Sequence, residues 1–257
     1  MPGRSGKLGR MPTRLVHLVV DANDPAPLAA FWAGALGWDV ADETQDEEFD
    51  VWPAGFSYPD PVAVPLVFVP VPEPKTVKNR VHLDLASTSL AHQADLVSRV
   101  RDLGATPVDI GQGDVPWVVL ADPEGNEFCI LEPREIYRDT GPVAAIVMDC
   151  AGPATLSRFW TAASGWEVAC TRDSNVGLRS PGGAGPFLEV LRVPERKSVK
   201  NRIHPDVAPY LGDDPAAEVA RLRGKGATPA DVGQGENVTW TVLADPEGNE
   251  FCVLSPR

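Results

Sequence analysis

The sequence has no apolar run near the ~20 residues that a membrane-spanning helix needs. Basic residues are also scarce, because 23 Lys and Arg face 36 Asp and Glu and leave a formal net charge of −13. A protein that binds nucleic acid or an anionic membrane needs a concentrated basic surface. The two shortages predict a protein whose partner is neither nucleic acid nor membrane.

Cysteine is scarce as well, with four in 257 residues. Four cysteines in a chain of this size do not make a disulfide framework, so a reducing cytoplasm is expected. Residues 1–12 are basic but are not followed by an apolar core, so they predict a flexible leader and not a secretory signal. The overall composition, 43% hydrophobic and 23% charged, is typical of a globular protein.

One stretch is present twice, almost letter for letter. Ala121-Asp-Pro-Glu-Gly-Asn-Glu-Phe-Cys-Ile-Leu131 returns with a single change as the segment from Ala244 to Leu254. Asp-Pro-Glu-Gly is turn chemistry, in which Pro123 presets φ and Gly125 suits the fourth position. The flanking runs are β-rich, so each stretch predicts a hairpin at the end of a duplicated unit.

Other matched segments set the limits of the duplication. Val77-Lys-Asn-Arg-Val-His82 corresponds to Val199-Lys-Asn-Arg-Ile-His204, and paired tryptophans precede each segment. The copies predict one domain over residues 13–133 and a second over residues 142–257. Residues 134–141, which are rich in charge and contain a glycine, form the predicted linker.

Each copy repeats one order of elements within itself. A strand carrying His17 precedes a helix that begins after Asp24, and further strands follow. A strand carrying His82 then precedes a second helix over residues 87–103 and the final strands. The pattern predicts an α+β fold of four βαβββ modules, two in each copy.

Paired βαβββ modules, a His on the first strand of each, and a final Asp-Pro-Glu-Gly-Asn hairpin resemble the vicinal oxygen chelate superfamily. This group includes glyoxalase I, extradiol dioxygenases, fosfomycin-resistance transferases and bleomycin-binding proteins. The Lys-Asn-Arg-Val-His-Leu-Asp and Asp-Pro-Glu-Gly-Asn-Glu-Phe-Cys segments are similar to its actinobacterial glyoxalase-like branch. The resemblance implies that the two modules of a domain curve into a half-open barrel around one cavity that binds a small molecule.

The resemblance also implies where a divalent metal would bind. Catalytic relatives use one first-strand residue from each module and a carboxylate on the last strand. In the first domain these positions hold His17, His82 and Cys129, and Glu127 is a substitute carboxylate. Two His with a carboxylate suit non-haem iron, whereas two His with a Cys favour zinc. The other reading is that Cys129 is a small buried apolar side chain.

The second copy offers fewer ligands. His204 is kept, but the counterpart of His17 is Ala145 and the counterpart of Cys129 is Cys252. Glu189 is a stray carboxylate on a predicted strand. Because neither copy holds a complete set, the sequence favours cavities without a cofactor.

Each second-module His is followed two residues later by an Asp, as His82 with Asp84 and His204 with Asp206. On a strand the two side chains share a face, so each pair is a candidate acid/base unit. The alternative is a hydrogen-bonded pair that fixes strand register.

Six further residues are candidates for ligand binding: Trp52, Lys78, Arg80, Trp117, Arg202 and Trp240. The basic ones either steer an anion into the cavity or pair with the carboxylates near the module crossover. Among the tryptophans, Trp52 has no counterpart in the second copy and is the best candidate for stacking on a ligand.

Three functions remain open. The favoured one is a cytoplasmic protein, monomer or homodimer, whose cavities hold an organic metabolite or drug without a complete metal site. The second is a metal-dependent glyoxalase-like lyase or dioxygenase that uses the first domain. The third is a metal-free enzyme that uses His82 and Asp84.

Overall fold

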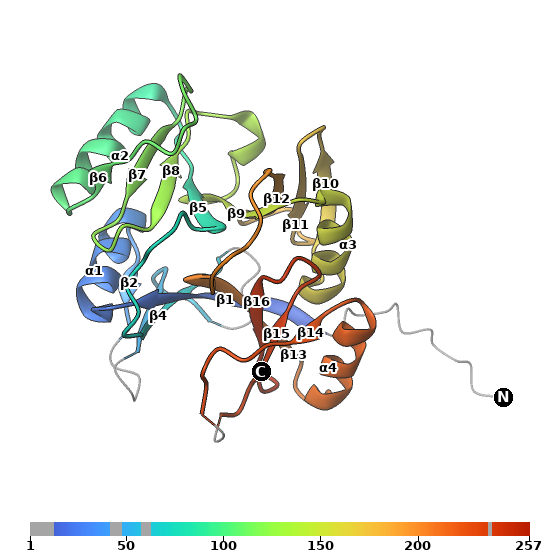
Figure 1. Cartoon of the computed structure of the whole chain (residues 1–257). Helices are drawn as coiled ribbons and strands as arrows, with labels where there is room; N and C mark the ends of the chain where they lie inside the picture. The colour runs from blue at the N-terminus through green and yellow to red at the C-terminus, as the bar shows by residue number, and fades with distance from the viewer. Residues whose placement is uncertain (1–12, 42–47, 58–62, 236–237) are drawn as a thin grey trace.

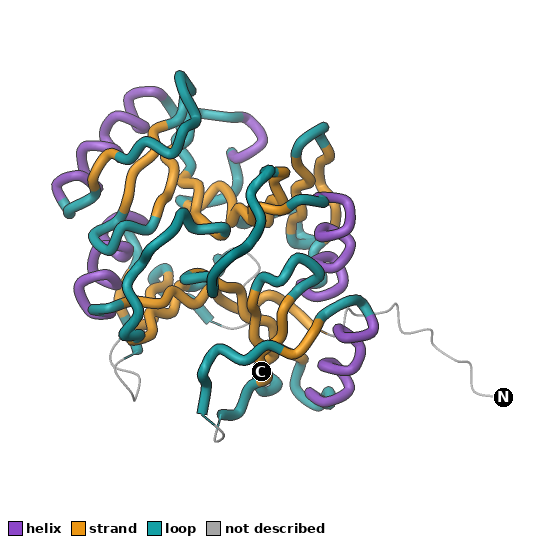
Figure 2. The backbone as a smooth tube through the Cα atoms, viewed as in Figure 1, coloured by secondary structure: helices purple, strands orange, loops and turns teal. Residues whose placement is uncertain are grey.

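The computed structural model describes residues 13–41, 48–57, 63–235 and 238–257, and the predicted leader of residues 1–12 lies outside this range. Within the described residues the chain forms two eight-stranded sheets and four α-helices (Figure 1). Helices lie mainly toward the edges of the molecule and strands run through its middle (Figure 2). None of the described helices has both the length and the apolar character needed to cross a bilayer. The predicted α+β class is confirmed.

The first sheet, called sheet A, is built from the two ends of the chain. In spatial order its strands are β14 (Thr228–Pro229), β15 (Thr241–Ala244), β16 (Glu250–Val253), β13 (Ile203–Pro209), β1 (Thr13–Ala22), β4 (Leu66–Pro70), β3 (Phe49–Trp52) and β2 (Asp39–Val40). Its two central strands, β1 and β13, are antiparallel.

The second sheet, called sheet B, is built from the middle of the chain. In spatial order its strands are β10 (Glu167–Thr171), β11 (Asn175–Arg179), β12 (Phe187–Arg192), β9 (Val143–Cys150), β5 (Val81–Leu85), β8 (Glu127–Ile130), β7 (Val118–Ala121) and β6 (Thr106–Pro107). Its central pair, β5 and β9, is also antiparallel.

This strand order corrects one expectation. The two modules of one copy do not share a sheet: module one pairs with module four in sheet A, and module two pairs with module three in sheet B. Each half-open sheet is therefore shared between the copies. The side chains that meet across the central strand pair of each sheet come from different copies.

The first helix of each copy has the start and stop signals expected from sequence. The helices α1 (Pro25–Leu36) and α3 (Pro153–Ser164) begin with proline, whose missing N–H costs nothing in the first turn. Each ends at a glycine in the left-handed region, with φ 68° at Gly37 and 74° at Gly165.

The second helix of each copy begins with a side-chain cap. At α2 (Leu90–Asp102) the hydroxyl of Ser89 accepts the His92 N–H at 3.0 Å. At α4 (Pro215–Gly224) the carboxylate of Asp214 accepts the Ala216 N–H at 2.9 Å. These bonds satisfy N–H groups that lack partners within the helix.

One apolar core lies between the helices and the helix-side faces of both sheets, with Phe68, Phe128, Trp160 and Phe251 among its fully buried members. The opposite face of each sheet, here called the site face, carries a smaller cluster. On sheet B this cluster includes Cys129, and on sheet A it includes Cys252. The residues with functional chemistry lie on these site faces.

The repeated hairpin joins the two modules of each copy. Asp122 accepts the backbone N–H of Glu124 and of Asn126 at 3.0 and 2.8 Å, and Gly125 takes φ 84° in the turn. The same carboxylate accepts the indole N–H of Trp32 from α1 at 3.1 Å. Asp245 and Trp160 repeat this contact in the second copy. The hairpin predicted from sequence therefore also anchors the neighbouring module.

Candidate functional site

Strand register aligns two rows of side chains across the site face of sheet A. The first row runs Asp50, Val67, Val19 and His204 over β3, β4, β1 and β13. The second row runs His17, Asp206, Cys252 and Val242 over β1, β13, β16 and β15. Alternation along β3 places Trp52 on the same face as Asp50. Two His, two carboxylates and a Cys thus share one face.

Three of these side chains, His204, Asp206 and Cys252, form a compact cluster, and His17 contacts it through Asp206. His17 Nε2 lies 2.9 Å from Asp206 Oδ2, and His204 Nε2 lies 3.6 Å from Asp206 Oδ1. Cys252 Sγ lies 3.8 Å from His204 Nε2. Only 8% of His17, 3% of Asp206 and 6% of Cys252 is exposed. The residues come from both ends of the chain and are brought together by the pairing of β1 with β13.

Burial sets the protonation of this cluster. It lowers the pKa of His204, although the charge of Asp206 opposes the shift. It raises the pKa of the Cys252 thiol well above its usual range, and Asp206 adds to that effect. His204 is therefore neutral at pH 7 and has a nitrogen lone pair to offer, while the unmetallated thiol keeps its proton.

Asp50 lies beside this cluster. Burial raises the pKa of its carboxyl group, and the charges of His17 and Arg257 oppose the rise. Its neighbour in sequence, Val51, is fully buried in the helix-side core. The Asp50 side chain therefore belongs to the site face, on the side of the cluster nearest Trp52.

The same two rows of side chains occur on the site face of sheet B, but several of their residues differ in chemical type. Its first row runs Gly177, Glu189, Val147 and His82, and its second runs Arg179, Phe187, Ala145, Asp84 and Cys129. Ala145 stands at the position of His17. The ligand atoms of His82, Asp84 and Cys129 lie within 4.8 Å of one another, as do those of His204, Asp206 and Cys252. The two clusters match except for the added His17 on sheet A.

The predicted acid/base pairs lie close together but are not hydrogen-bonded. His82 Nε2 is 3.7 Å from Asp84 Oδ1, similar to the 3.6 Å between His204 and Asp206. Burial raises the pKa of Asp84, and His82 opposes the rise. The geometry is compatible with the predicted role, which stays a prediction.

The linker between the copies crosses the site face of sheet B. Its 3-10 helix η1 (Glu135–Tyr137) places the Tyr137 hydroxyl 2.7 Å from Glu189 Oε1. The tyrosine ring packs edge-on against Phe187, with ring centroids 5.6 Å apart. Asn175 donates to the other oxygen of Glu189 at 2.9 Å. Sheet B therefore holds a side chain of the protein itself on its site face.

The structure does not bring His17 and His82 together. His17 lies on sheet A, whereas His82 and Cys129 lie on sheet B, so the predicted metal site of His17, His82 and Cys129 is corrected. Glu127, the predicted substitute ligand, instead binds Lys75 Nζ at 2.7 Å and the Asn79 N–H at 3.1 Å. The cause is the pairing of modules across the copies.

The three basic residues predicted to bind a ligand contact other parts of the protein. Lys78 Nζ lies 2.5 Å from Asp149 Oδ2. Arg80 donates to the backbone oxygens of Asp149 and Glu195 at 2.6 and 2.9 Å. These contacts match the alternative in which the crossover residues pair within the protein.

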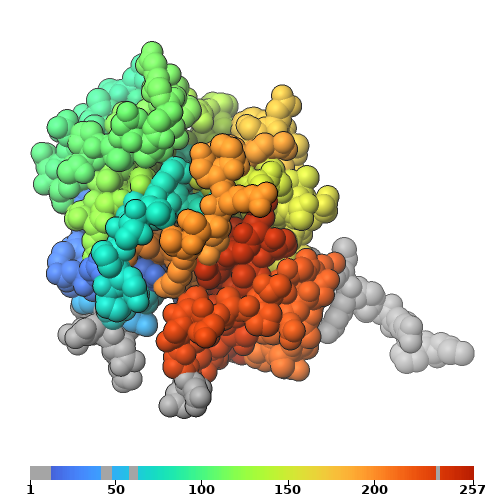
Figure 3. Space-filling view, viewed as in Figure 1, coloured from blue at the N-terminus to red at the C-terminus, as the bar shows by residue number. Residues whose placement is uncertain are grey.

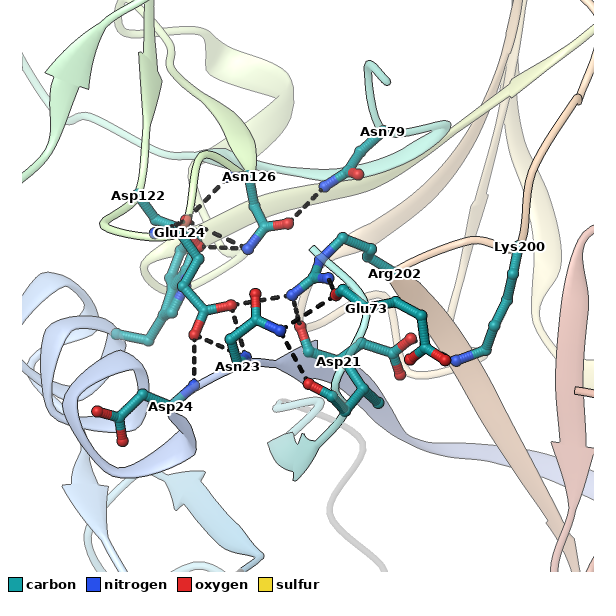
Figure 4. Close-up of polar contacts among 12 residues, drawn as sticks. Asp21, Asn23, Asp24, Glu73, Asn79, Asp122, Glu124, Asn126, Lys200 and Arg202 are labelled. Carbon is teal, nitrogen blue, oxygen red and sulfur yellow. Dashed lines mark hydrogen bonds and ion pairs between the residues drawn. The ribbon is translucent and has the colours of Figure 1, made fainter. Parts of the chain in front are cut away.

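Arg202 is the counterpart of Arg80 in the second copy and lies in the network of polar contacts shown in Figure 4. Its guanidinium contacts Glu124 Oε2 at 2.9 Å, the Asp21 carbonyl at 2.8 Å and the Glu73 carbonyl at 2.6 Å. Glu124 in turn accepts the backbone N–H of Asn23 and of Asp24, each at 2.8 Å. The charge of Arg202 is thus neutralised inside the protein and is not available to steer a ligand.

The three candidate tryptophans differ in their surroundings. Trp52 stacks on Phe56, with centroids 5.7 Å apart and ring planes 18° apart, on the site face of sheet A. Trp117 lies under the Arg134 guanidinium at 5.5 Å, beside the linker of sheet B. Trp240 is 39% exposed. Of the three, Trp52 is nearest to the row of Asp50.

Two residues of these faces were not predicted from sequence. Asp50 lies two residues from the candidate Trp52, which is the spacing of side chains on one face of a strand, but its closeness to His17 depends on the register of three strands. Tyr137 lies in the linker, where no periodic pattern marks a contact. Glu189, recognised as a stray carboxylate, lies with His82 on sheet B and not with His204.

The donor set of sheet A fits a divalent metal. Asp206 Oδ1 and His204 Nδ1 are buried and have no hydrogen-bond partner among the described residues. Two imidazoles, a carboxylate and a thiol are ligands that zinc accepts in mixed sets. A cavity of about 640 Å³ lies elsewhere, between α1, α2 and the linker, and neither cluster lines it.

The shared sheets, the four modules and the paired clusters define a tandem vicinal oxygen chelate architecture. The sequence profile of the glyoxalase-like domain matches residues 17–131 and again residues 145–254. The chain belongs to this family. The family resemblance inferred from the repeated motifs is confirmed.

Solved structures show the same fold at low sequence identity. Glyoxalase I from Zea mays has a TM-score of 0.64 at 12% identity, covering 95% of this chain and 92% of that one. A candidate dioxygenase from Bacillus subtilis subsp. subtilis str. 168 has a TM-score of 0.58 at 12% identity, covering 94% and 84%. A comparison with curated proteins finds no match.

Proposed function

We propose that the protein is a glyoxalase-type, metal-dependent enzyme that acts on a small organic molecule at the site face of sheet A. His17, His204, Asp206 and Cys252 would hold the divalent metal. The observation that supports this is the pairing of β1 with β13, which places His17 against Asp206 of the triad His204, Asp206 and Cys252. The set that is incomplete within either copy is completed between them.

The residues around the cluster suit this role. A bound metal would supply a Lewis acid that polarises an oxygen of the substrate. The lowered pKa of His204 keeps its imidazole neutral, which is the form that binds metal. Asp206 has one oxygen engaged by His17 and a second that is unpartnered among the described residues. The chain therefore presents its donors without having to break an internal salt bridge to a Lys or Arg.

Sheet B has a structural role in this proposal. It lacks the second imidazole, because Ala145 replaces His17, and Tyr137 and Asn175 both bind its additional carboxylate. We expect one metal per chain, and we expect it on sheet A.

The test is metal content after purification without chelator. Wild type and His82→Ala should retain close to one zinc or iron per chain, and His17→Ala and His204→Ala should lose it. His82→Ala is the matched control, because it removes the equivalent imidazole from sheet B. Metal kept in His17→Ala, or lost in His82→Ala, would contradict the assignment.

A second readout identifies the thiol. Co²⁺ added to metal-free protein should produce a thiolate charge-transfer band in the near ultraviolet that is absent from Cys252→Ser and present in Cys129→Ser. If both variants keep the band, Cys252 is not a ligand.

A metal-free binding protein is the second candidate. The hydrogen bond between His17 and Asp206 engages one oxygen of the carboxylate without a metal, and burial keeps the Cys252 thiol protonated. If wild-type protein holds no metal and Co²⁺ gives no band, this function replaces the first.

A further inference from the structure

The linker of this protein shows what the site face of a sheet in this fold accepts. Tyr137 packs edge-on against Phe187 and shares a buried cluster with Ala145 and Val147 on sheet B, and its hydroxyl donates to the carboxylate of Glu189. The side chain is only 6% exposed. A phenol ring with its hydroxyl on a carboxylate is thus buried on the sheet that is equivalent to sheet A.

Sheet A offers an apolar floor, a carboxylate and an aromatic wall from its own residues. Val67 and Val19 form an apolar floor in the row where sheet B has Glu189 and Val147. The carboxylate is displaced by one strand, because Asp50 lies beside Val67 on β3. Neighbouring strands are about 4.8 Å apart, so a ring above the two valines would reach the Asp50 carboxylate.

The equivalent place on sheet B has no carboxylate and little room for one. Gly177 occupies it, and a Cβ there would lie 2.7 Å from Cys170 Sγ and 3.2 Å from Phe187 Cδ1. Asp50 is therefore a feature of sheet A alone. The aromatic wall is also specific to sheet A: Trp52, stacked on Phe56, stands where sheet B has Arg179.

We propose that the site face of sheet A binds a small planar phenol in the position that Tyr137 occupies on sheet B. The ring lies on Val67 and Val19 beside Trp52, and the hydroxyl donates a hydrogen bond to Asp50. This inference rests on the proposed function for the location of the ligand, and it adds the chemical class of that ligand.

The first test is binding of 4-nitrophenol, followed by its absorbance, with 4-nitroanisole as the analogue that lacks the hydroxyl. Asp50→Asn should weaken 4-nitrophenol binding about tenfold or more, the usual loss for a hydrogen bond to a charged group. Trp52→Ala should also weaken it, by up to about tenfold. 4-Nitroanisole should bind wild type no better than 4-nitrophenol binds Asp50→Asn.

Tyr137→Phe is the matched control, because it removes a phenolic hydroxyl from sheet B and leaves sheet A unchanged. It should bind 4-nitrophenol as wild type does. Equal affinity of wild type, Asp50→Asn and Trp52→Ala would overturn the proposal, and circular dichroism of each variant confirms that it is folded.

The second test asks whether sheet B itself accepts a free phenol. Tyr137→Ala leaves a space of the shape of a phenol ring next to Glu189, and phenol should raise the melting temperature of this variant more than that of wild type. Benzene, which has no hydroxyl, should raise it less. If phenol raises the melting temperatures of the variant and of wild type equally, sheet B no longer supports a phenol site on sheet A.

The metal site and the phenol site can be tested independently of each other. Metal content does not depend on phenol binding, and 4-nitrophenol binding can be measured on metal-free protein. Loss of metal in His17→Ala with unchanged phenol affinity in Asp50→Asn would uphold the metal site and overturn the ligand class. Phenol binding that requires Asp50 in a protein without metal would do the opposite.

Discussion

Ala145 and His17 occupy equivalent positions on the two sheets, and the exchange of one imidazole for a methyl group separates two otherwise matched clusters. Both clusters keep a His and an Asp two residues apart, and both place a Cys beside them. Both also bury a carboxylate oxygen that has no hydrogen-bond partner among the described residues, Asp84 Oδ1 on sheet B and Asp206 Oδ1 on sheet A. Such oxygens are expensive to bury, so both clusters are expected to reduce stability.

The variant Asp84→Asn tests how much the buried carboxylate lowers the stability of the protein on sheet B, where no metal is proposed. Burial raises the pKa of Asp84 in the folded protein, so the ionised carboxylate destabilises the fold at a pH above this raised pKa. The destabilisation disappears below pH 3.8, the pKa in the unfolded chain, because the carboxyl group is then protonated in both states. We expect the variant to be more stable than wild type at pH 7, by about 1–3 kcal/mol. The difference should shrink as the pH falls toward 4.

The measurement is urea denaturation of both proteins across that pH range. A wild-type protein that is the more stable of the two at pH 7 would show that the contacts of Asp84 with His82 and Cys129 outweigh its desolvation.

At the scale of elements, the crossover segments, residues 71–80 and 193–202, hold the two sheets together. They run side by side across the face of the molecule shown in Figure 3. Arg80 contacts the backbone of Glu195, and Arg202 contacts the backbone of Glu73, so each segment binds the other copy. The repeated hairpins complete the arrangement, because Glu124 and Glu247 approach Arg202 and Arg80. This polar network joins the two copies at their crossover segments.

Arg202→Ala should therefore be strongly destabilising. It would leave Glu124, with only 13% of its side chain exposed, without its cationic partner. Breaking a buried ion pair from one side costs about 3–5 kcal/mol. Thermal and urea denaturation would measure the loss.

Arg138→Ala is the control for this variant. It breaks an ion pair with Glu135 in which both side chains are mostly exposed, at 69% and 75%. Exposed pairs contribute about 0–1 kcal/mol, so this variant should unfold close to wild type. Similar losses in the two variants would show that the network around Arg202 is not special.

Local patterns were sufficient to predict the elements. Alternation, proline and glycine signals placed the strand of His17, the helix that begins after Asp24 and the repeated hairpin, and the duplication gave four modules. Sheet partnership was not predictable, because a strand pattern marks which face is apolar and not which edge it joins. The contact between His17 and Asp206 spans 189 residues and depends entirely on that choice.

At the scale of the whole molecule, the copies cannot separate without dividing both sheets. Each central pair, β1 with β13 and β5 with β9, joins one copy to the other. We expect one cooperative unfolding transition, with calorimetric and van't Hoff enthalpies that agree, although the chain contains two family domains. Arg202→Ala should lower the temperature of that single transition. Two resolved transitions in wild type would contradict this expectation.

The order in which modules share sheets closes the molecule on itself. Module one shares a sheet with module four, just as module two shares a sheet with module three. Arg14 at the start of β1 also donates a hydrogen bond to the carbonyl of Arg257. The chain is in effect a ring of four modules that has been opened between the fourth and the first. A circular permutant that joined these ends and opened the ring within residues 180–185 would keep every strand pair. In such a protein the cluster of His17 and His204, now assembled from distant ends, would lie within one continuous stretch of sequence.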